Sequence, residues 1–382
     1  MGLLLSTSIS EIQQETKTRG ERITDSDVIV AFKRANQYFN STYKMPTAQR
    51  EQDLLVYPGV YEYAAPSDFL GWADLQRPYG LNSPKFQNVT EDELIHDFNN
   101  RKTAFKFDRE TLYLLVKDDT GTGLTIHNFD DNSSNGAWSI SGDSPSLAVD
   151  ENFFTQGSAS LKFTITYSGG TTTLVNSTLS AVDLTDYKDV GKFFVELMAP
   201  SGNTSAITSV RLRIGSSASA YYEMTSTTRF RGDNINAGKG LIGFDFTSYT
   251  TTGSPTVTAL NYVQLVITGP ASGANGAYRI DNLFVALPTL YELPYYSQNN
   301  VKTTGGAYQQ HPTATTDTIL CPSDAENAYL YKVMEICAVH FLKDNSLAQY
   351  AARELEPYER TLKKKYPSQE KQTSNVYYRR FK

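Results

Sequence analysis

Hydrophobic residues recur at steps of three and four at both ends of the chain, the spacing of a helix that buries one face. One such stripe lies near the start, and two more, 330–341 and 347–362, lie near the end with Asp344-Asn345-Ser346 between them. The members of the first stripe are Val28, Phe32, Ala35 and Phe39. The pattern predicts a helix at the beginning of the chain and a helical hairpin at its end, which share one bundle.

Polar residues mark where these helices should begin. A Ser or Thr followed three residues later by an acidic residue forms a capping box, which satisfies free amides of the first helical turn. The pairs are Ser8 with Glu11, Thr24 with Asp27, and Ser323 with Glu326. Pro357 falls inside the last stripe and should bend or restart that helix.

The middle of the chain changes period from helical to alternating. Segments in which every second residue is apolar are typical of half-buried antiparallel strands, and turn-forming residues separate them. These segments are 161–167, 193–197, 210–214, 263–267 and 278–280. Charge is sparse here, since 19 of residues 132–280 are Asp, Glu, Lys or Arg, and Ser, Thr and Gly replace them. The pattern predicts an all-β sandwich.

The predicted fold is therefore α+β and multidomain. A polar, glycine-containing joint at 118–123 leads from the first segment into the sandwich. We expect a discontinuous helical-bundle domain made of residues 1–120 and 288–366, with an all-β jelly-roll sandwich, residues 121–287, inserted at a loop tip. Insertion at a loop tip is tolerated because the ends of a surface loop stay close together.

Residues 60–69, VYEYAAPSDF, resemble the tyrosine-rich strand and Pro-Ser-Asp-Phe turn of head-to-tail adaptor proteins of tailed bacteriophages. The resemblance implies a structural virion protein at the neck, made in the host cytoplasm. It also implies a homo-oligomeric ring, expected to be a dodecamer, that joins the portal protein to tail or neck proteins. DNA would pass through its lumen without specific binding, which suits a net charge of −6.

The end of the chain, residues 367–382, has no helical stripe and should be disordered alone. It concentrates residue types that anchor interfaces. By the adaptor resemblance, the segment that binds the portal consists of Tyr377, Tyr378, Arg379, Arg380, Phe381 and Lys382.

The sandwich resembles the jelly rolls of carbohydrate-binding modules in three places, residues 126–131, 157–161 and 278–283. The resemblance implies the alternative function of a glycan-binding accessory protein of a tail or baseplate, in which Trp138 could stack on sugar. It also implies a structural calcium ion where the first and last strands meet, bound by Asp130 or Asp131 and by Asp281. Carboxylate oxygens suit that hard ion. The alternative is that these aspartates cap turns or pair with Arg279.

Signatures of catalysis are missing from the sequence. It contains no P-loop, dinucleotide-binding fingerprint or G-x-S-x-G motif, and its four histidines do not have metal-ligand spacing. We therefore expect no enzyme activity and no cofactor other than the calcium ion. The N-terminal apolar run Leu3-Leu4-Leu5 is too short to cross a membrane, so we also expect no membrane segment. Two cysteines make no disulfide framework. Arg231-Gly232-Asp233 spells a cell-adhesion tripeptide, which three common residues also form by chance.

Overall fold

The computed structural model describes residues 2–18, 22–72, 87–88, 104–108, 111–115, 123–133, 135–143, 146–166, 169–200, 206–272 and 276–366. The chain forms two compact units, a helical unit (Met1–Gln52, Pro66–Gln76 and Glu292–Lys382) and a sandwich unit (Asp53–Ala65 and Arg77–Tyr291). The expected first segment, residues 1–120, is thus shared between the two units. Thr90 to Glu93 repeat the capping-box pattern and predict a short helix from Glu91 to Asn99, which lies outside the described residues.

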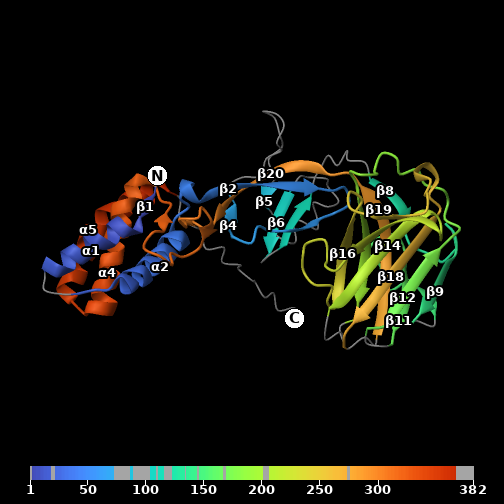
Figure 1. The fold of residues 1–382 in the computed structure, drawn as a ribbon, viewed down its shortest axis with the longest axis horizontal. Coiled ribbons are helices and arrows are strands. Elements are labelled where there is room, and N and C mark those ends of the chain that lie inside the picture. Colours follow the sequence, from blue (N-terminus) through green and yellow to red (C-terminus); the bar gives the residue numbers. More distant parts are fainter. Residues whose placement is uncertain are drawn as a thin grey trace, which may run out of the picture. The chain divides into compact units, whose positions relative to one another are not determined.

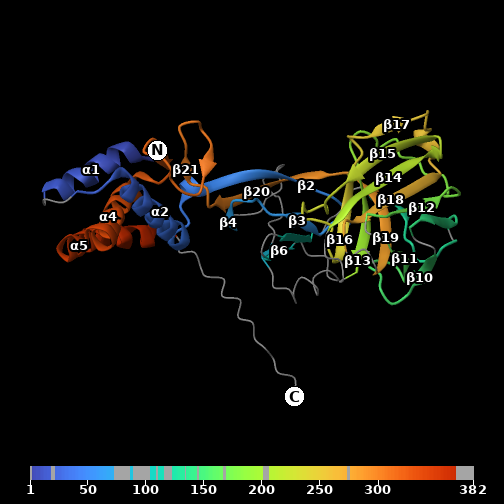
Figure 2. The ribbon, with the colours of Figure 1, turned by 60° about the horizontal axis from the view of Figure 1, so that its bottom comes forward.

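The helical unit contains the helices that the two ends of the chain predict. They are α1 (Leu5–Thr18), α2 (Asp25–Thr42), α4 (Glu326–Cys337), the π-helical turn η4 (Ala338–Leu342) and α5 (Asn345–Lys365). Figures 1 and 2 both show α2 beside α4 and α4 beside α5. The whole stripe of α2 is buried, and it packs in one core with Tyr329, Val333 and Cys337 of α4. The first and last helices therefore share a core, as the stripes predict.

The helix starts follow the sequence signals in one case of three. Thr24 and Asp27 form the expected capping box at α2. Ser8 lies inside α1 and donates to the Leu4 carbonyl, so the expected Ser8 cap is wrong. Ser323 does not cap α4, because residues 323–325 form a 3₁₀ turn, η3, before the helix begins.

The C-terminal hairpin turns where its two hydrophobic runs meet. Asp344 caps α5, since its carboxylate accepts from the amides of Ser346 and Leu347. Pro357 lies within α5 and neither ends nor restarts it, because α5 runs unbroken to Lys365.

Short strands and a buried polar network complete the helical unit. A four-stranded sheet has the order β1 (Leu3–Leu4), β23 (Thr318–Ile319), β21 (Val301–Lys302), β22 (Tyr308–Gln309). The turn η1 (Pro46–Ala48) precedes a three-stranded sheet with the order β2 (Gln49–Val56), β20 (Thr289–Ser297), β4 (Phe69–Trp72). Residues 53–56 of β2 and 289–291 of β20 belong to the sandwich unit.

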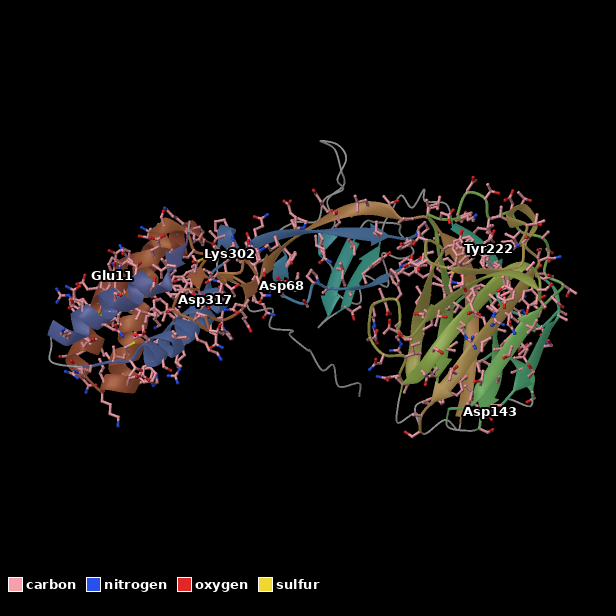
Figure 3. The ribbon with its side chains drawn as sticks, in the orientation of Figure 1. Glu11, Asp68, Asp143, Tyr222, Lys302 and Asp317 are labelled. Carbon is pink, nitrogen blue, oxygen red and sulfur yellow. The ribbon has the colours of Figure 1, made fainter. Side chains whose placement is uncertain are left out.

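Asp68, labelled in Figure 3, accepts from the hydroxyls of Tyr295 and Ser297. The fully buried Asn36 exchanges hydrogen bonds with Asn300 and accepts from Tyr329, so these three buried polar side chains satisfy one another.

The sandwich consists of two antiparallel sheets. One has the order β10 (Leu147–Asp150), β11 (Ser160–Ile165), β19 (Gly276–Ala286), β13 (Lys192–Ala199), β16 (Gly238–Asp245), and β8 (Gly123–His127) also pairs with β19. The other has the order β17 (Thr250–Thr252), β15 (Ala220–Ser226), β14 (Ile207–Ser217), β18 (Tyr262–Pro270), β12 (Thr171–Asn176), β9 (Trp138–Gly142). A 3₁₀ turn, η2 (Val257–Ala259), precedes β18. Figure 2 shows β17, β15, β14, β18 and β12 as neighbours.

The alternation in the sequence produces this core. In the middle of β14 and of β18, alternate residues are buried between the sheets, where they meet the inward residues of β13 and β19. These residues are Val210, Leu212, Ile214, Val263, Leu265 and Ile267. The predicted strands at 193–197, 210–214, 263–267 and 278–280 all lie within these four elements. The all-β sandwich is therefore confirmed by its sheet order.

The tyrosine-rich segment near residue 60 packs against the sandwich. Tyr57 and Tyr63 surround Phe230, with ring centroids 5.7 and 5.6 Å away, and Tyr57 also meets Phe194 at 5.1 Å. Strand β3 (Glu62–Ala64) continues through this segment into a sheet with the order β3, β7 (Thr111–Leu115), β6 (Ala104–Asp108), β5 (Gln87–Asn88). These aromatic contacts are the physical reason that residues 53–65 belong to the sandwich unit.

Candidate functional site

The aspartates expected to bind calcium hold one loop, residues 151–159, between β10 and β11. Asp130 Oδ1 accepts from the amides of Ser158 and Ala159, the latter at 2.9 Å. Asp281 Oδ2 accepts from the amides of Thr155, at 2.5 Å, and Gln156, at 3.1 Å. Both carboxylates thus serve as turn caps, the alternative that the sequence left open.

The fit of these residues to a calcium ion is partial. Asp281 is fully buried, its Oδ1 accepts no hydrogen bond, and burial raises its pKa. Asp131 accepts from the amide of Ser133 at 2.6 Å. Within the described ranges, no three His, Cys, Asp or Glu side chains come together to hold a metal ion. Asp281 Oδ1 would therefore be the main carboxylate ligand, with backbone or water oxygens beside it, and the calcium site stays a prediction.

Trp138 does not form a platform for sugar. Its side chain is only 4% exposed and packs in the core against Phe129, with ring centroids 5.0 Å apart. Its indole Nε1 donates to His127 Nε2 at 3.1 Å, and burial lowers the pKa of His127 to about 4. The expected stacking role of Trp138 is wrong, because its ring is enclosed between the two sheets.

The Arg-Gly-Asp tripeptide is engaged within the sandwich unit. Arg231 Nε and Nη2 donate to the two carboxylate oxygens of Asp233 at 2.6 and 3.0 Å. Arg231 also pairs with Glu62 at 3.1 Å, and Arg229 pairs with Asp233 at 3.0 Å. The two charged side chains of the tripeptide therefore bind each other and their neighbours.

The expected portal-binding residues, Tyr377 to Lys382, lie outside the described residues. Among the helices that are described, none combines the length and the apolar character that crossing a membrane requires.

A different set of residues lies together on the outer face of the sheet that contains β14, β15 and β18. Tyr222, labelled in Figure 3, is buried in the sandwich core, so its neighbours along β15, Tyr221 and Glu223, point outward. By strand register, Tyr221, Gly215 of β14 and Tyr262 of β18 form one row across three strands.

The tyrosines of this row meet above a glycine. Their ring centroids are 6.5 Å apart and their planes are tilted by 30°. A Cβ atom on Gly215 would lie 2.6 Å from Cβ of Tyr221 and 2.1 Å from the Ala220 carbonyl oxygen, so only glycine leaves room for this approach. Tyr262 is only 5% exposed, and this burial raises its pKa. Tyr221 is half-buried, so it is the ring of this row that solvent reaches.

The next row, Glu223, Arg213 and Gln264, is held by hydrogen bonds. Arg213 Nε donates to Glu223, and Nη1 donates to Gln264 Oε1 at 2.9 Å. The guanidinium also stacks on Tyr221, 4.8 Å from its ring centroid. We define these five side chains and Gly215 as the Tyr221 platform. It combines one accessible aromatic ring, that of Tyr221, with a fixed guanidinium, carboxylate and amide, which suits a neutral, hydroxyl-rich ligand.

The sequence contains a signal for this platform that lies outside its recognisable motifs. Three pairs at a spacing of two, Arg211 with Arg213, Tyr221 with Glu223, and Tyr262 with Gln264, interrupt apolar alternation with polar or aromatic residues. Such pairs mark the outer face of a strand. Only the register of β14 with β15 and β18 reveals that they share rows.

No protein-family model matches the sequence, and no curated protein matches it. The solved structures to which this chain is similar include a family 30 carbohydrate-binding module of a cellulosomal cellulase of Clostridium thermocellum, at 8% identity, covering 43% of this chain and 96% of that chain, with a TM-score of 0.32. A family 11 carbohydrate-binding module from the same organism has 10% identity and a TM-score of 0.28, and the match covers 43% of this chain and 94% of that chain. The enzymatically active domain of tailspike protein 4 of bacteriophage CBA120 has 12% identity and a TM-score of 0.26, and the match covers 43% of this chain and 21% of that chain. Likenesses at this level indicate neither a ligand nor a partner for this chain.

The calcium site generates a stability prediction. An ion that binds only the folded state stabilises it by mass action, so excess calcium should raise the melting temperature of the full chain after chelator treatment. Asp281→Ala should melt earlier because the loop loses its acceptor, and it should no longer respond to calcium. Differential scanning fluorimetry with EGTA and then calcium measures both effects.

Asp143→Ala is the matched control, because Asp143 accepts from Thr166 at a different turn. This variant should keep the calcium response. Identical melting curves of the wild-type chain with chelator and with calcium would remove the site.

Proposed function

We propose that the sandwich is a glycan-binding module and that the Tyr221 platform is its binding surface. The observation that carries the proposal is the partly exposed ring of Tyr221, packed against the buried Tyr262, beside the row of Glu223, Arg213 and Gln264 on one sheet face. Saccharides present apolar C–H faces together with hydroxyls that both donate and accept. Aromatic rings beside fixed polar groups match both properties.

The platform is organised before any ligand arrives. Glu223 and Gln264 fix the plane of the Arg213 guanidinium, and Tyr221 supports its face. A guanidinium has five N–H donors, so donors remain for saccharide hydroxyls after these two hydrogen bonds. Fixing the side chains in advance lowers the entropy cost of binding.

Binding to a glycan array by the full chain tests this proposal. Tyr221→Ala removes the ring beneath the guanidinium, and Arg213→Gln removes the donors. Each should weaken binding about tenfold or more, the scale of losing a central aromatic or Arg contact. Lys239→Gln, which neutralises an exposed lysine on the other sheet, is the matched control and should bind normally.

Circular dichroism should give the same spectrum for all the variants, because the substituted side chains point outward. Wild-type binding by both Tyr221→Ala and Arg213→Gln would reject the platform as the binding surface.

We propose as a second function that the helical unit acts as a head-to-tail adaptor subunit in a virion ring, with the sandwich displayed by the ring. Large apolar side chains of this unit are exposed, which supports contact with further subunits. They are Leu4 at 44%, Val30 at 39%, Val339 at 50% and Tyr350 at 38%. The portal partner and Tyr377 to Lys382 as its binding segment come from the sequence resemblance.

Negative-stain microscopy of the chain mixed with portal protein tests the adaptor function. Truncation after Asn375 should leave the melting temperature unchanged, because the last residues are expected to be disordered alone. The truncated chain should no longer dock. Full-length protein that forms no ring with portal, or truncated protein that docks at wild-type affinity, would contradict this function.

A further inference from the structure

A hollow lies on the outer face of the other sheet, where its edge strand β10 pairs with β11. Its volume is about 360 Å³, and its lining includes Ala148, Asp150, Asn152, Lys162 and Thr164. Ala148 and Lys162 are partners across the two strands. The small side chain of Ala148 leaves space beside the long side chain of Lys162. We call this feature the β10–β11 hollow.

One end of the hollow is built from fixed charged groups. Asp150 is only 7% exposed and accepts from the amide of Asn152 at 3.1 Å and from Arg279 Nε at 2.8 Å. These hydrogen bonds lower its pKa, so Asp150 is ionised at neutral pH. Lys162 Nζ lies 3.9 Å from the same carboxylate, while its side chain is 43% exposed. Its ammonium group therefore remains accessible to a ligand.

An exposed aromatic ring adjoins these groups. Phe153 follows the lining residue Asn152 and is 58% exposed, and the Arg279 guanidinium lies 4.6 Å from its ring centroid. Arg279 thus supports one face of Phe153 and binds Asp150 at the same time. The carbonyl of Phe153 accepts from Ser160 Oγ at 2.5 Å, which fixes the backbone that carries the ring.

The balance of charge limits what this surface can bind. Two acidic side chains, Asp150 and Glu151, stand beside two basic ones, Lys162 and Arg279. A polyanion such as nucleic acid favours a clear excess of positive charge. A neutral saccharide needs a ring to stack on, together with donors and acceptors for its hydroxyls, and this surface supplies all of them.

We propose that the β10–β11 hollow and Phe153 form a second saccharide subsite, separate from the Tyr221 platform and on the opposite sheet. The inference rests on the proposed glycan-binding function for its ligand class only, since its residues are independent of the platform. A neutral saccharide stacks on the free face of Phe153. Lys162 and Asn152 bind its hydroxyls within the hollow. The module is then bivalent, and two weak sites on one chain raise the avidity for a polysaccharide.

Calorimetric titration of the full chain tests the subsite. The probe is the neutral oligosaccharide that binds most strongly on a glycan array, and the wild-type chain should bind two molecules. Phe153→Ala and Lys162→Gln should each weaken one site about tenfold, the scale of losing a stacked ring or a charged hydrogen-bond donor. Tyr221→Ala should weaken only the other site.

Tyr308→Ala is the matched control. Tyr308 is 50% exposed and has the guanidinium of Arg50 4.6 Å from its ring centroid, so it reproduces the Arg–aromatic pair in the helical unit. This variant should bind two molecules as the wild type does. Equal loss in Tyr308→Ala and Phe153→Ala would overturn the subsite.

The remaining outcomes separate this inference from the proposed function. Normal binding by Phe153→Ala and Lys162→Gln, with loss in Tyr221→Ala, overturns the subsite and leaves the platform. Loss in Phe153→Ala with normal binding in Tyr221→Ala supports the subsite and overturns the platform. Failure of the wild-type chain to bind any saccharide on the array overturns both, and a Phe153-dependent site that binds only anionic saccharides overturns the neutral ligand class.

Discussion

Alternate burial along the strands of the sandwich is the constraint on which the rest of this unit depends. Once Leu212, Ile214 and Tyr222 enter the core, their neighbours must face outward. Strand pairing then aligns these outward residues in rows, so packing of the core fixes which polar side chains lie next to each other. The Tyr221 platform depends on this register, because a shift of one residue would bury Arg213 and expose leucine.

On the opposite sheet, strand pairing places two carboxylates, rather than apolar side chains, side by side and largely away from solvent. Glu196 of β13 lies directly opposite Asp281 of β19, and each has one buried oxygen without a hydrogen-bond partner. Burial is the main cause that raises the pKa of Glu196 to about 7. A raised pKa means that Glu196 favours the folded state most at low pH, and this contribution is lost as the pH rises through about 7. The loop of residues 151–159, whose amides donate to Asp281, therefore lies beside two carboxylates. Burial makes the charged form of both carboxylates unfavourable.

Much of the fold could be predicted from periodicity, whereas the candidate sites could not. The stripe of α2 and the alternation of β13, β14, β18 and β19 are local patterns, so each segment reports its own structure. The helix starts were less reliable, because Ser323 enters a 3₁₀ turn that its own sequence does not mark. The position of Tyr57 and Tyr63 depends on Phe194 and Phe230, which lie far along the chain.

The binding surfaces depend on the same long-range information. Tyr221, Gly215 and Tyr262 are ordinary residues singly, and they become a platform only through the pairing of three strands. Trp138 is the stacking residue that the resemblance to carbohydrate-binding modules predicts, yet its place in β9 turns it inward. The wider lesson is that the outward rows of a sheet, rather than its rarest residues, locate a surface for ligands.

The most direct test of the central claim is a crystal structure of the full chain with an oligosaccharide that binds it on a glycan array. Electron density for the saccharide should lie over the ring of Tyr221, with a hydroxyl bound by Arg213. A saccharide found only on other surfaces of the sandwich, with the Tyr221 row bare, would contradict it.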